Sequence, residues 1–302
     1  MKMVLIGTVA IPFCLISQQA FAWGSKGHEA VNRVAISMVS SPEVKKFLEA
    51  NRKELLQFAN TPDNKWKSND ATRDKERPMH WFEMDAYGKN RLGESLKDLP
   101  FAKAEEELGK DYVAQYGLAM WRINDFYVQL VEALKKNDLK LAIQISGVMG
   151  HYVGDITQPM HATSDYDGQS INKPGAHKYY ETTLVDEIDA DHLFDAVQKV
   201  AGERRSGLER SIGNDLENAE LQKVSWSEAC DSYAAVGSVY SRFDKESPED
   251  GWLKDDLMPR IGRAAALLGK IWDVAFTVSG ISRIQGENVG ADEPEWIPMS
   301  GS

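Results

Sequence analysis

The sequence predicts an all-α protein with a single domain, and three features of the chain support this. Apolar residues recur at helical spacing through most of the chain, whereas the alternating pattern typical of strands is scarce. No linker rich in Gly, Ser or Pro divides the sequence, and no internal repeat or low-complexity tract is present in it. A chain of 302 residues can bury one large core. We therefore expect one multi-helix domain over residues 23–280.

The helical patterns follow one another along the chain. The first covers residues 31–39, with Ser25 as a candidate cap, and another covers residues 139–152. Residues 60–100 carry three prolines and many charges, which is typical of a long structured loop, and such loops are usually functional. Residues 281–302 show no clear pattern and are expected to form a loose tail. Further helices are expected at residues 42–58, 117–135, 185–203, 226–242 and 257–278.

Residues 1–22 have the features of a secretory signal peptide. Lys2 supplies a positive charge, residues 3–16 are apolar but too few to span a membrane, and residues 20–22 form a small-residue cleavage site. The alternative, a retained membrane anchor, is disfavoured because the polar residues 17–19 follow the apolar run. We therefore expect a secreted or periplasmic protein that begins at Trp23 and has no transmembrane span.

Cysteine content and charge restrict the class of protein further. Cys14 is lost with the signal peptide, so Cys230 has no intramolecular partner and the fold does not rely on a disulfide. The formal charge is −11, and removal of Lys2 leaves 34 basic against 46 acidic residues, or −12. Broad nucleic-acid binding by basic surfaces is therefore disfavoured. A nuclease whose positive charge is carried by metal ions remains compatible. We expect a monomer.

Residues 147–181 hold three of the six histidines and two well-placed carboxylates. Residues four apart lie on one face of a helix, so His151 with Asp155, and His177 with Glu181, can each direct two ligand atoms to one point. A lone histidine is more often an ordinary core or surface residue than a ligand. Five nitrogen and oxygen ligands in one short stretch, His161 being the fifth, instead indicate a metal site.

The path of the chain between these pairs is set by proline. Pro159 has no backbone N–H and disfavours helical geometry at Gln158, so the first helix is expected to end there. The chain then turns just before His161. That histidine can therefore face a second metal ion close to the first.

Other ligand candidates lie towards the N-terminus. After cleavage, Trp23 would offer a free α-amine and a carbonyl oxygen that can chelate one ion, and His28 follows at the start of a helix. Taken alone, a buried tryptophan beside a satisfied histidine is the more common arrangement. Asp63 lies in a turn context, and His80 lies between Met79 and an aromatic pair. His192 has no ligand partner in register and is expected to be structural or exposed.

This ordered set of residues resembles the zinc-dependent phospholipase C family and the single-strand-specific zinc nucleases that share its fold. The similarity runs from Trp23 to about residue 195, and it comprises an N-terminal Trp, a His, an Asp, a His, then His-x3-Asp-x5-His and His-x3-Glu. It implies an all-helical domain with three zinc ions. One zinc would be held by Asp63, His80, His151 and Asp155; a second by His161, His177 and Glu181; a third by the amine and carbonyl of Trp23, His28 and again Asp155.

The ligand chemistry favours zinc independently, because five imidazoles with carboxylates suit it better than Mg²⁺ or Ca²⁺. A phosphodiester held across the zinc ions would have its charge neutralised, and a water activated at the zinc would attack phosphorus. Asp63 is a candidate general base, although a residue committed to a metal has limited freedom for that role. A hydrolase of phosphoric esters is therefore the expected activity.

The substrate is less clearly indicated. The spacing from Trp23 to His28 resembles the nucleases, whereas Glu181 resembles phospholipase C, because the nucleases usually have Asp there. The nucleases place a basic residue three positions after the first Asp, where this chain has Trp66, and a Gly-Gly-Asn run where it has residues 168–170, Gly-Gln-Ser.

We therefore expect a phospholipase C-like enzyme acting on phospholipid head groups. A single-strand-specific nuclease or 3′-nucleotidase is the first alternative, and a non-catalytic zinc-stapled binding protein is the second. Trp66, Trp81 and Phe82 are candidate substrate contacts, which would meet a lipid or stack on bases, unless they belong to the core. A zinc held by three side chains keeps a position open, which disfavours a purely structural site.

Overall fold

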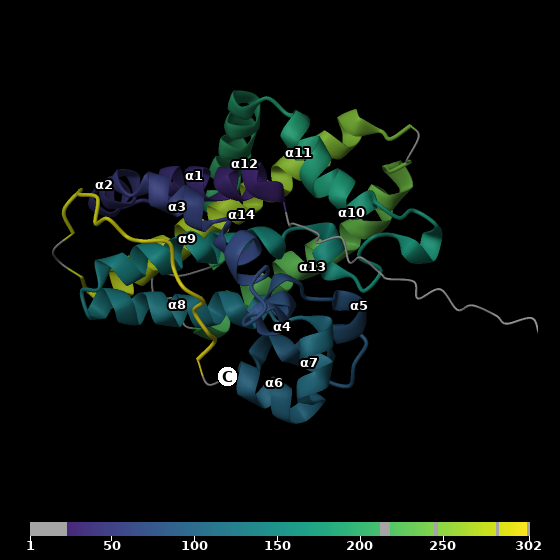
Figure 1. The fold of residues 1–302 in the computed structure, drawn as a ribbon, viewed down its shortest axis with the longest axis horizontal. Coiled ribbons are helices and arrows are strands. Elements are labelled where there is room, and N and C mark those ends of the chain that lie inside the picture. Colours follow the sequence, from purple (N-terminus) through teal and green to yellow (C-terminus); the bar gives the residue numbers. More distant parts are fainter. Residues whose placement is uncertain (1–22, 212–217, 245–246, 282–283, 301–302) are drawn as a thin grey trace, which may run out of the picture.

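The fold is all helical, as expected, and is described from a computed structural model of residues 23–211, 218–244, 247–281 and 284–300. The predicted signal peptide lies outside these residues. No strand occurs among them. Six long helices form the body of the molecule (Figure 1): α1 (Gly24–Met38), α8 (Ala119–Lys135), α9 (Leu139–Asp155), α12 (Ala190–Ser211), α13 (Asn218–Arg242) and α14 (Asp250–Ser279).

Shorter helices connect and cover the long ones. The short α-helices are α2 (Pro42–Ala50), α3 (Arg52–Phe58), α4 (Arg73–Glu76), α5 (Met84–Tyr87), α6 (Phe101–Leu108), α7 (Lys110–Tyr116), α10 (Ala176–Lys178) and α11 (Leu184–Glu187). The 3₁₀ turns are η2 (Arg77–His80), η3 (Gly93–Asp98), η4 (Pro159–Ala162) and η5 (Gln169–Ile171), and the π-helical turns are η1 (Pro62–Trp66) and η6 (Tyr179–Thr183). The predicted loop over residues 60–100 is thus a chain of short helical turns.

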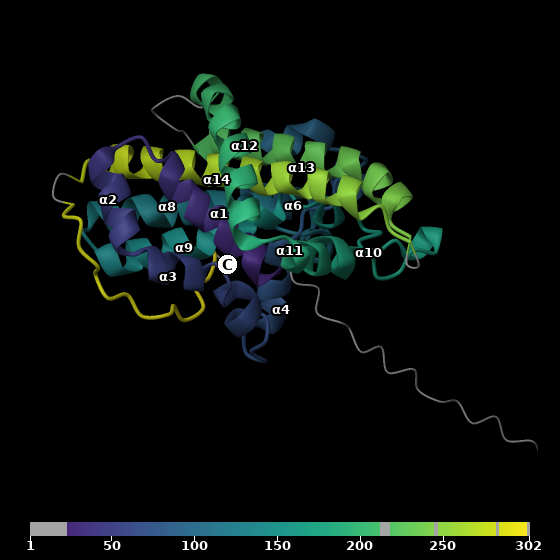
Figure 2. The same ribbon diagram turned by 90° about the horizontal axis from the view of Figure 1, so that it is seen from above.

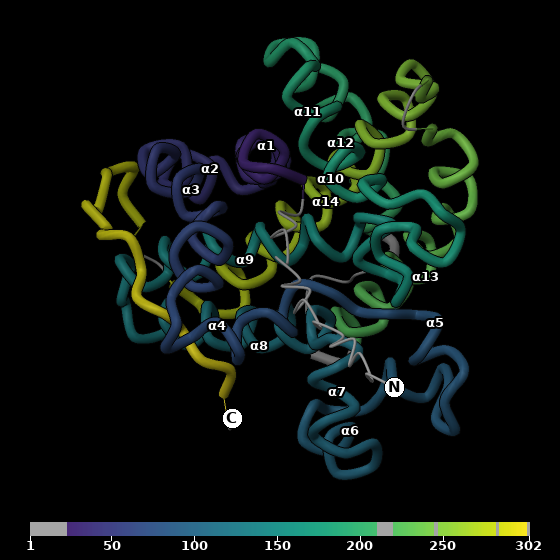
Figure 3. Tube along the Cα trace, turned by 45° about the vertical axis from the view of Figure 1, so that its right-hand side comes forward, coloured from purple at the N-terminus to yellow at the C-terminus, as the bar shows by residue number. Residues whose placement is uncertain are grey.

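Helix α9 lies at the centre of the molecule, with α1, α3, α8 and α14 packed against it (Figure 3). Its N-terminus is capped by Asp138, whose side chain accepts a hydrogen bond from the Leu141 amide. Its last helical residue is Asp155, and Gln158 is extended just before Pro159, as the sequence predicts. Helix α14 crosses the molecule and packs on α12 and α1 (Figure 2).

Several helix boundaries differ from the prediction. The pattern over residues 185–203 forms two helices, α11 and α12, because Ile188 between them is extended, and α13 and α14 begin earlier than expected. Ser25 does not cap α1, because the helix begins at Gly24 with Trp23 in the cap position. The pattern over residues 42–58 forms two helices, since Asn51 interrupts it: its side-chain amide donates to the Phe47 carbonyl and to the Glu287 carbonyl. A side chain that bonds to the backbone in this way competes with helix continuation.

The residues after α14 are not a loose tail. They run as an extended segment, yellow in Figures 1 and 3, back along the molecule towards α4 and α8. Ala291 and Met299 are buried, and the Trp66 indole donates to the Pro294 carbonyl. Hydropathy could not predict this packing, because many of the contacts are made by backbone carbonyls and by polar side chains. In the part of the chain that is described, no helix is both long and apolar enough to cross a membrane.

Candidate metal centre

A row of glycines on α9 allows α1 and α3 to approach it closely. An added Cβ at Gly147 would lie 2.6 Å from Phe58 Cβ, and one at Gly150 would overlap the Asn32 side chain. The buried Asn32 amide joins the three helices, because it donates to the Leu55 carbonyl at 2.7 Å and to the Gly147 carbonyl at 2.9 Å. This close packing brings the first turns of α1 to the C-terminal end of α9.

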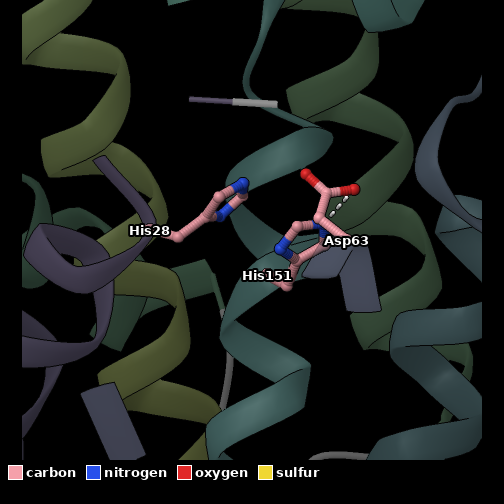
Figure 4. Close-up of side chains that lie close together, drawn as sticks. All are labelled: His28, Asp63 and His151. Atoms are coloured by element: carbon pink, nitrogen blue, oxygen red, sulfur yellow. Dashed lines mark ion pairs between the residues drawn. The ribbon is translucent and has the colours of Figure 1, made fainter. Parts of the chain in front are cut away.

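The first group of ligands gathers at that end of α9. His28 from α1 stacks on His151, with ring centroids 3.9 Å apart, and its Nε2 lies 3.6 Å from Asp155 Oδ1. His80 Nδ1 lies 3.1 Å from Asp155 Oδ2 and 3.0 Å from His151 Nε2. Asp63 Oδ1 lies 3.7 Å from His151 Nε2 (Figure 4). All five side chains are buried.

The second group lies on the segment that follows α9. His177 and Glu181 belong to one continuous helical segment, in which α10 passes into the π-turn η6. His177 Nε2 is 2.8 Å from Glu181 Oε2, and His161 Nε2 is 3.6 Å from the same oxygen. Gln158 Nε2 donates to Glu181 Oε2 at 2.9 Å and holds the carboxylate in place. One ligand atom from each of His161, His177 and Glu181 fits within 4.8 Å of the other two.

Backbone carbonyls select which nitrogen two of these histidines present. His151 Nδ1 lies 2.8 Å from the Ala59 carbonyl, and His161 Nδ1 contacts the His80 carbonyl. A carbonyl oxygen can only accept, so in both rings Nδ1 carries the proton and Nε2 keeps its lone pair. Such outer contacts are the usual way in which a protein orients a metal-binding imidazole.

The pKa values of the buried histidines and of Asp155 are those expected of a cation-binding site. Burial lowers the pKa of His28, His80 and His151 well below 6.5, which leaves these rings neutral and able to bind a metal. Burial and the negative charge of Asp63 raise the pKa of Asp155 well above its usual value. The positive charge of Lys67 lowers this pKa but does not outweigh them, so a bound cation would stabilise the ionised carboxylate further.

Several buried polar atoms in this group have no hydrogen-bond partner, and this indicates whether the residues could bind a metal ion. Both ring nitrogens of His28, Asp155 Oδ1 and Glu181 Oε1 are buried and form no hydrogen bond. Buried polar atoms are almost always paired, so such a concentration of lone pairs needs an explanation. Three sets of residues bring their ligand atoms within 4.8 Å of one another: His28, Asp63 and His151; His80, His151 and Asp155; His161, His177 and Glu181. The donor set suits zinc.

Trp23 is fully buried at the edge of this centre. Its indole Nε1 donates to the Gly154 carbonyl at 2.7 Å, and its ring lies 5.6 Å from that of Tyr180. Its φ of 40° is left-handed, which is rare for a bulky residue. The ring is therefore a buried packing residue, as the more common arrangement predicts, and its indole lies against Gly154, the residue before Asp155.

The structure gathers all eight predicted side-chain ligands, but it does not support two of the three predicted substrate contacts. Trp66 and Phe82 are each 1% exposed. The Phe82 ring packs on Tyr87, and the Trp66 indole lies under the C-terminal residues. Neither ring can reach a substrate, because both are enclosed by the core. Trp81 is half-buried, and His192 is exposed and apart from the centre, as expected.

Lys67 is a candidate functional residue that the sequence did not reveal. Its Nζ forms an ion pair with Asp63 Oδ1 inside the centre, and the residue is only 7% exposed. The two residues are four apart in the helical turn η1, and this spacing places their side chains on one face. The basic residue that seemed to be replaced by Trp66 is therefore present one position later.

An all-helical domain with buried imidazole and carboxylate ligands in adjacent groups is the arrangement expected for a zinc-dependent hydrolase of phosphoric esters. Comparison with protein families confirms this class. The S1/P1 nuclease family model matches residues 23–246, most of the chain, and the protein therefore belongs to that family. A comparison with curated proteins gave no significant match.

Solved structures with a similar fold include clostridial alpha toxins. The alpha toxin of Clostridium absonum gives a TM-score of 0.57 at 16% identity, over 86% of this chain and 67% of the toxin. The alpha toxin of an avian strain of Clostridium perfringens gives 0.54 at 19% identity, over 85% of this chain and 65% of the toxin. This chain spans about two thirds of the length of these toxins. At these identities the likeness concerns the fold alone.

Proposed function

We propose that this protein is a secreted phosphodiesterase that uses three zinc ions to cleave single-stranded nucleic acid. The observation that carries this substrate choice is Lys67, a basic side chain inside the metal centre of a chain whose family is that of the S1/P1 nucleases. The formal net charge of −11 disfavours a broad basic surface that would hold a phosphate backbone. We therefore place phosphate recognition at the metal centre.

The residues that would hold the ions are those that the family resemblance implies. Asp63, His80, His151 and Asp155 would hold one ion, and His161, His177 and Glu181 would hold a second. A third would be held by His28, Asp155 and the amine and carbonyl of Trp23, with Trp23 as the N-terminus left by signal-peptide cleavage. When bound, zinc supplies Lewis-acid chemistry: it neutralises phosphate charge and lowers the pKa of water towards about 7.

The remaining roles belong to the chain itself. Lys67 donates to a phosphate oxygen and adds positive charge where negative charge develops during the reaction. Asp63 is the candidate general base, although its contacts with Lys67 and His80 restrict its movement. Trp81, the half-buried member of the predicted aromatic set, is the candidate for stacking on a base.

Glu181 favours a second candidate substrate, the phospholipid head group. The carboxylate at this position resembles that of the zinc-dependent phospholipases C. The pKa of Glu181 falls to about 2 because His177 and His161 outweigh the effect of burial, so it is ionised at any pH at which the enzyme would work. The phosphodiester is common to both substrates, and the same centre could hydrolyse either one.

A direct assay decides between the substrates. Mature protein loaded with zinc is incubated with single-stranded DNA, single-stranded RNA, double-stranded DNA and phosphatidylcholine vesicles, and the products are quantified. We expect rapid cleavage of the single strands and little of the duplex. Release of phosphocholine without any cleavage of nucleic acid would reject the nuclease in favour of the lipase. If no substrate is turned over, the second alternative, a non-catalytic binding protein that is stabilised by zinc, would be supported instead.

A further inference from the structure

Residues 284–300, called here the C-terminal segment, contact two parts of the chain that carry metal ligands. Lys65 Nζ and the Trp66 indole in the turn η1 both donate to the Pro294 carbonyl, each at 3.2 Å. This turn also carries Asp63. The Trp296 indole Nε1 donates to Glu76 Oε2 at 2.8 Å. Glu76 ends α4, directly before the turn η2 that carries His80.

Glu76 joins the C-terminal segment to a metal ligand. Its Oε1 lies 3.2 Å from His80 Nε2 and also accepts a hydrogen bond from the Tyr152 hydroxyl. Glu76, Tyr152 and His80 are at most 2% exposed, so water does not compete for these contacts. Arg122, fully buried beside them, donates to the Ile297 carbonyl and thereby binds the same part of the C-terminal segment.

The two ring nitrogens of His80 face different groups, the other candidate metal ligands on one side and Glu76 on the other. Its Nδ1 points into the ligand group, close to His151 and Asp155, whereas its Nε2 lies 3.2 Å from Glu76 Oε1, an ion-pair contact that is not aligned as a hydrogen bond. A carboxyl group on the far nitrogen of a metal-binding imidazole sets which nitrogen keeps the lone pair, and it orients the ring. Glu76 can do this only if its own position is fixed, and Tyr152 and Trp296 each hold one of its oxygens.

We propose that Trp296 is a positioning residue of the metal centre, which acts through Glu76 to orient His80 for metal binding. The C-terminal segment is then a functional part of the zinc site, although it lies beyond the family match at residues 23–246. This inference rests on the metal-binding part of the proposed function and is independent of the substrate.

Substitution of Trp296 by Phe tests the inference, because it keeps an aromatic ring and removes only the N–H donor. Zinc affinity is measured on the folded full-length protein by competition with a chelator, and the Co²⁺ form is examined by absorption spectroscopy. Trp252→Phe is the matched control, since Trp252 contacts Arg242 and lies outside the centre. Glu76→Gln is the second variant, which keeps the shape of the side chain and removes its charge.

We expect both Trp296→Phe and Glu76→Gln to weaken binding of one zinc by about 10–100-fold and to shift the Co²⁺ absorption bands. Trp252→Phe should leave both unchanged. A purely structural role for Trp296 predicts a lower melting temperature with unchanged affinity and spectrum, and that result would overturn the inference. If Trp296→Phe does not fold, the zinc affinity and the Co²⁺ spectrum of Glu76→Gln test the inference by the same criteria. An unmodified protein that binds no zinc would instead overturn the proposed function itself.

Discussion

At the scale of single residues, Asp155 is the carboxylate on which the centre depends most. Its two oxygens face three histidines, His28, His80 and His151, which arrive from three different segments. Asp63 lies near the same three histidines, but it also pairs with Lys67, whereas Asp155 Oδ1 forms no hydrogen bond. A carboxylate in this position can bind two ions at once, and its charge offsets that of both.

Substitution of Asp155 by Asn should abolish activity and lower the zinc content, because the change removes a charge shared by two metal sites while keeping the volume. Metal analysis and turnover on a generic phosphodiester measure the effect. His192→Ala is the control, since His192 is exposed and outside the centre. A loss from His192→Ala comparable to that from Asp155→Asn would show that the ligand assignment is wrong.

Substitution of Lys67 should lower the catalytic rate without changing metal binding. Lys67→Met keeps the aliphatic stem and removes the charge, so we expect kcat to fall by about 10²–10³-fold while the zinc content stays unchanged. Lys67→Arg should restore part of the rate. Lys65→Met in the same turn is the control, because Lys65 forms an ion pair with Glu295 outside the centre. Equal rates for Lys67→Met and the unmodified enzyme would exclude Lys67 from the reaction.

At the scale of elements, the glycines of α9 determine how its neighbours approach. A Cβ at Gly154 would lie 3.0 Å from His28 Nδ1, and one at Gly150 would overlap Asn32 and approach Leu268 at 2.8 Å. Helix α1, which carries Asn32 and His28, cannot move away without losing the hydrogen bonds of Asn32. The close packing of helices and the geometry of the ligand group are therefore coupled.

Gly150→Ala should lower the free energy of unfolding by about 1–3 kcal/mol, despite the higher helix propensity of alanine, because the added methyl group overpacks the contact with α1. Urea denaturation measures the change. Gly202→Ala in α12 has open space around its Cβ and should stabilise by about 0.5–1 kcal/mol. If both variants were stabilised, the close approach of α1 and α9 would not be a constraint.

At the scale of the whole molecule, the metal centre joins segments that are far apart in the sequence. The ligand side chains come from α1, η1, η2, α9, η4 and the helical segment of residues 176–183. Cys230 is a free cysteine, and no disulfide is present in the described residues. Zinc would therefore provide the cross-links that disulfides supply in many small proteins.

Removal of zinc should therefore lower the melting temperature steeply. Ligands that bind only the folded state stabilise it in proportion to the logarithm of their concentration over Kd. Chelation followed by calorimetry measures the effect, and elemental analysis should find close to three zinc ions per chain. A zinc-free protein with unchanged melting temperature and activity would contradict both the stabilising role and the catalytic one.

Processing of the N-terminus should matter for the third zinc. An amide nitrogen has no lone pair available for a metal, so residues 23–302 expressed behind an uncleaved tag should lose one zinc and most of the activity. Proteolysis that leaves Trp23 first should restore both, whereas one extra Gly before it should not. If Trp23 only packs, these forms will have equal metal content and equal turnover.

The helices and part of the candidate site could be predicted from the sequence because both depend on local spacing. A helical repeat places residues four apart on one face, so His151 with Asp155, and His177 with Glu181, were visible as pairs without a structure. The end of the helix before Pro159 was equally local, because proline restricts the residue that precedes it. His28, Asp63 and His80 have no such local signature, and they were predicted only through the resemblance to the zinc-dependent phospholipases C and zinc nucleases.

Tertiary structure decided what depends on contacts between distant segments. Residues 62–67 were expected to lie in a loop, so the helical turn that places Lys67 over Asp63 became evident only in the structure. Burial of Trp66 and Phe82 was undecidable from sequence, since an aromatic residue serves a core and a binding surface equally well. The C-terminal segment showed no periodicity because its backbone carbonyls make many of the contacts, and every residue type carries that group. Only the fold could therefore place Trp296 beside Glu76 and His80.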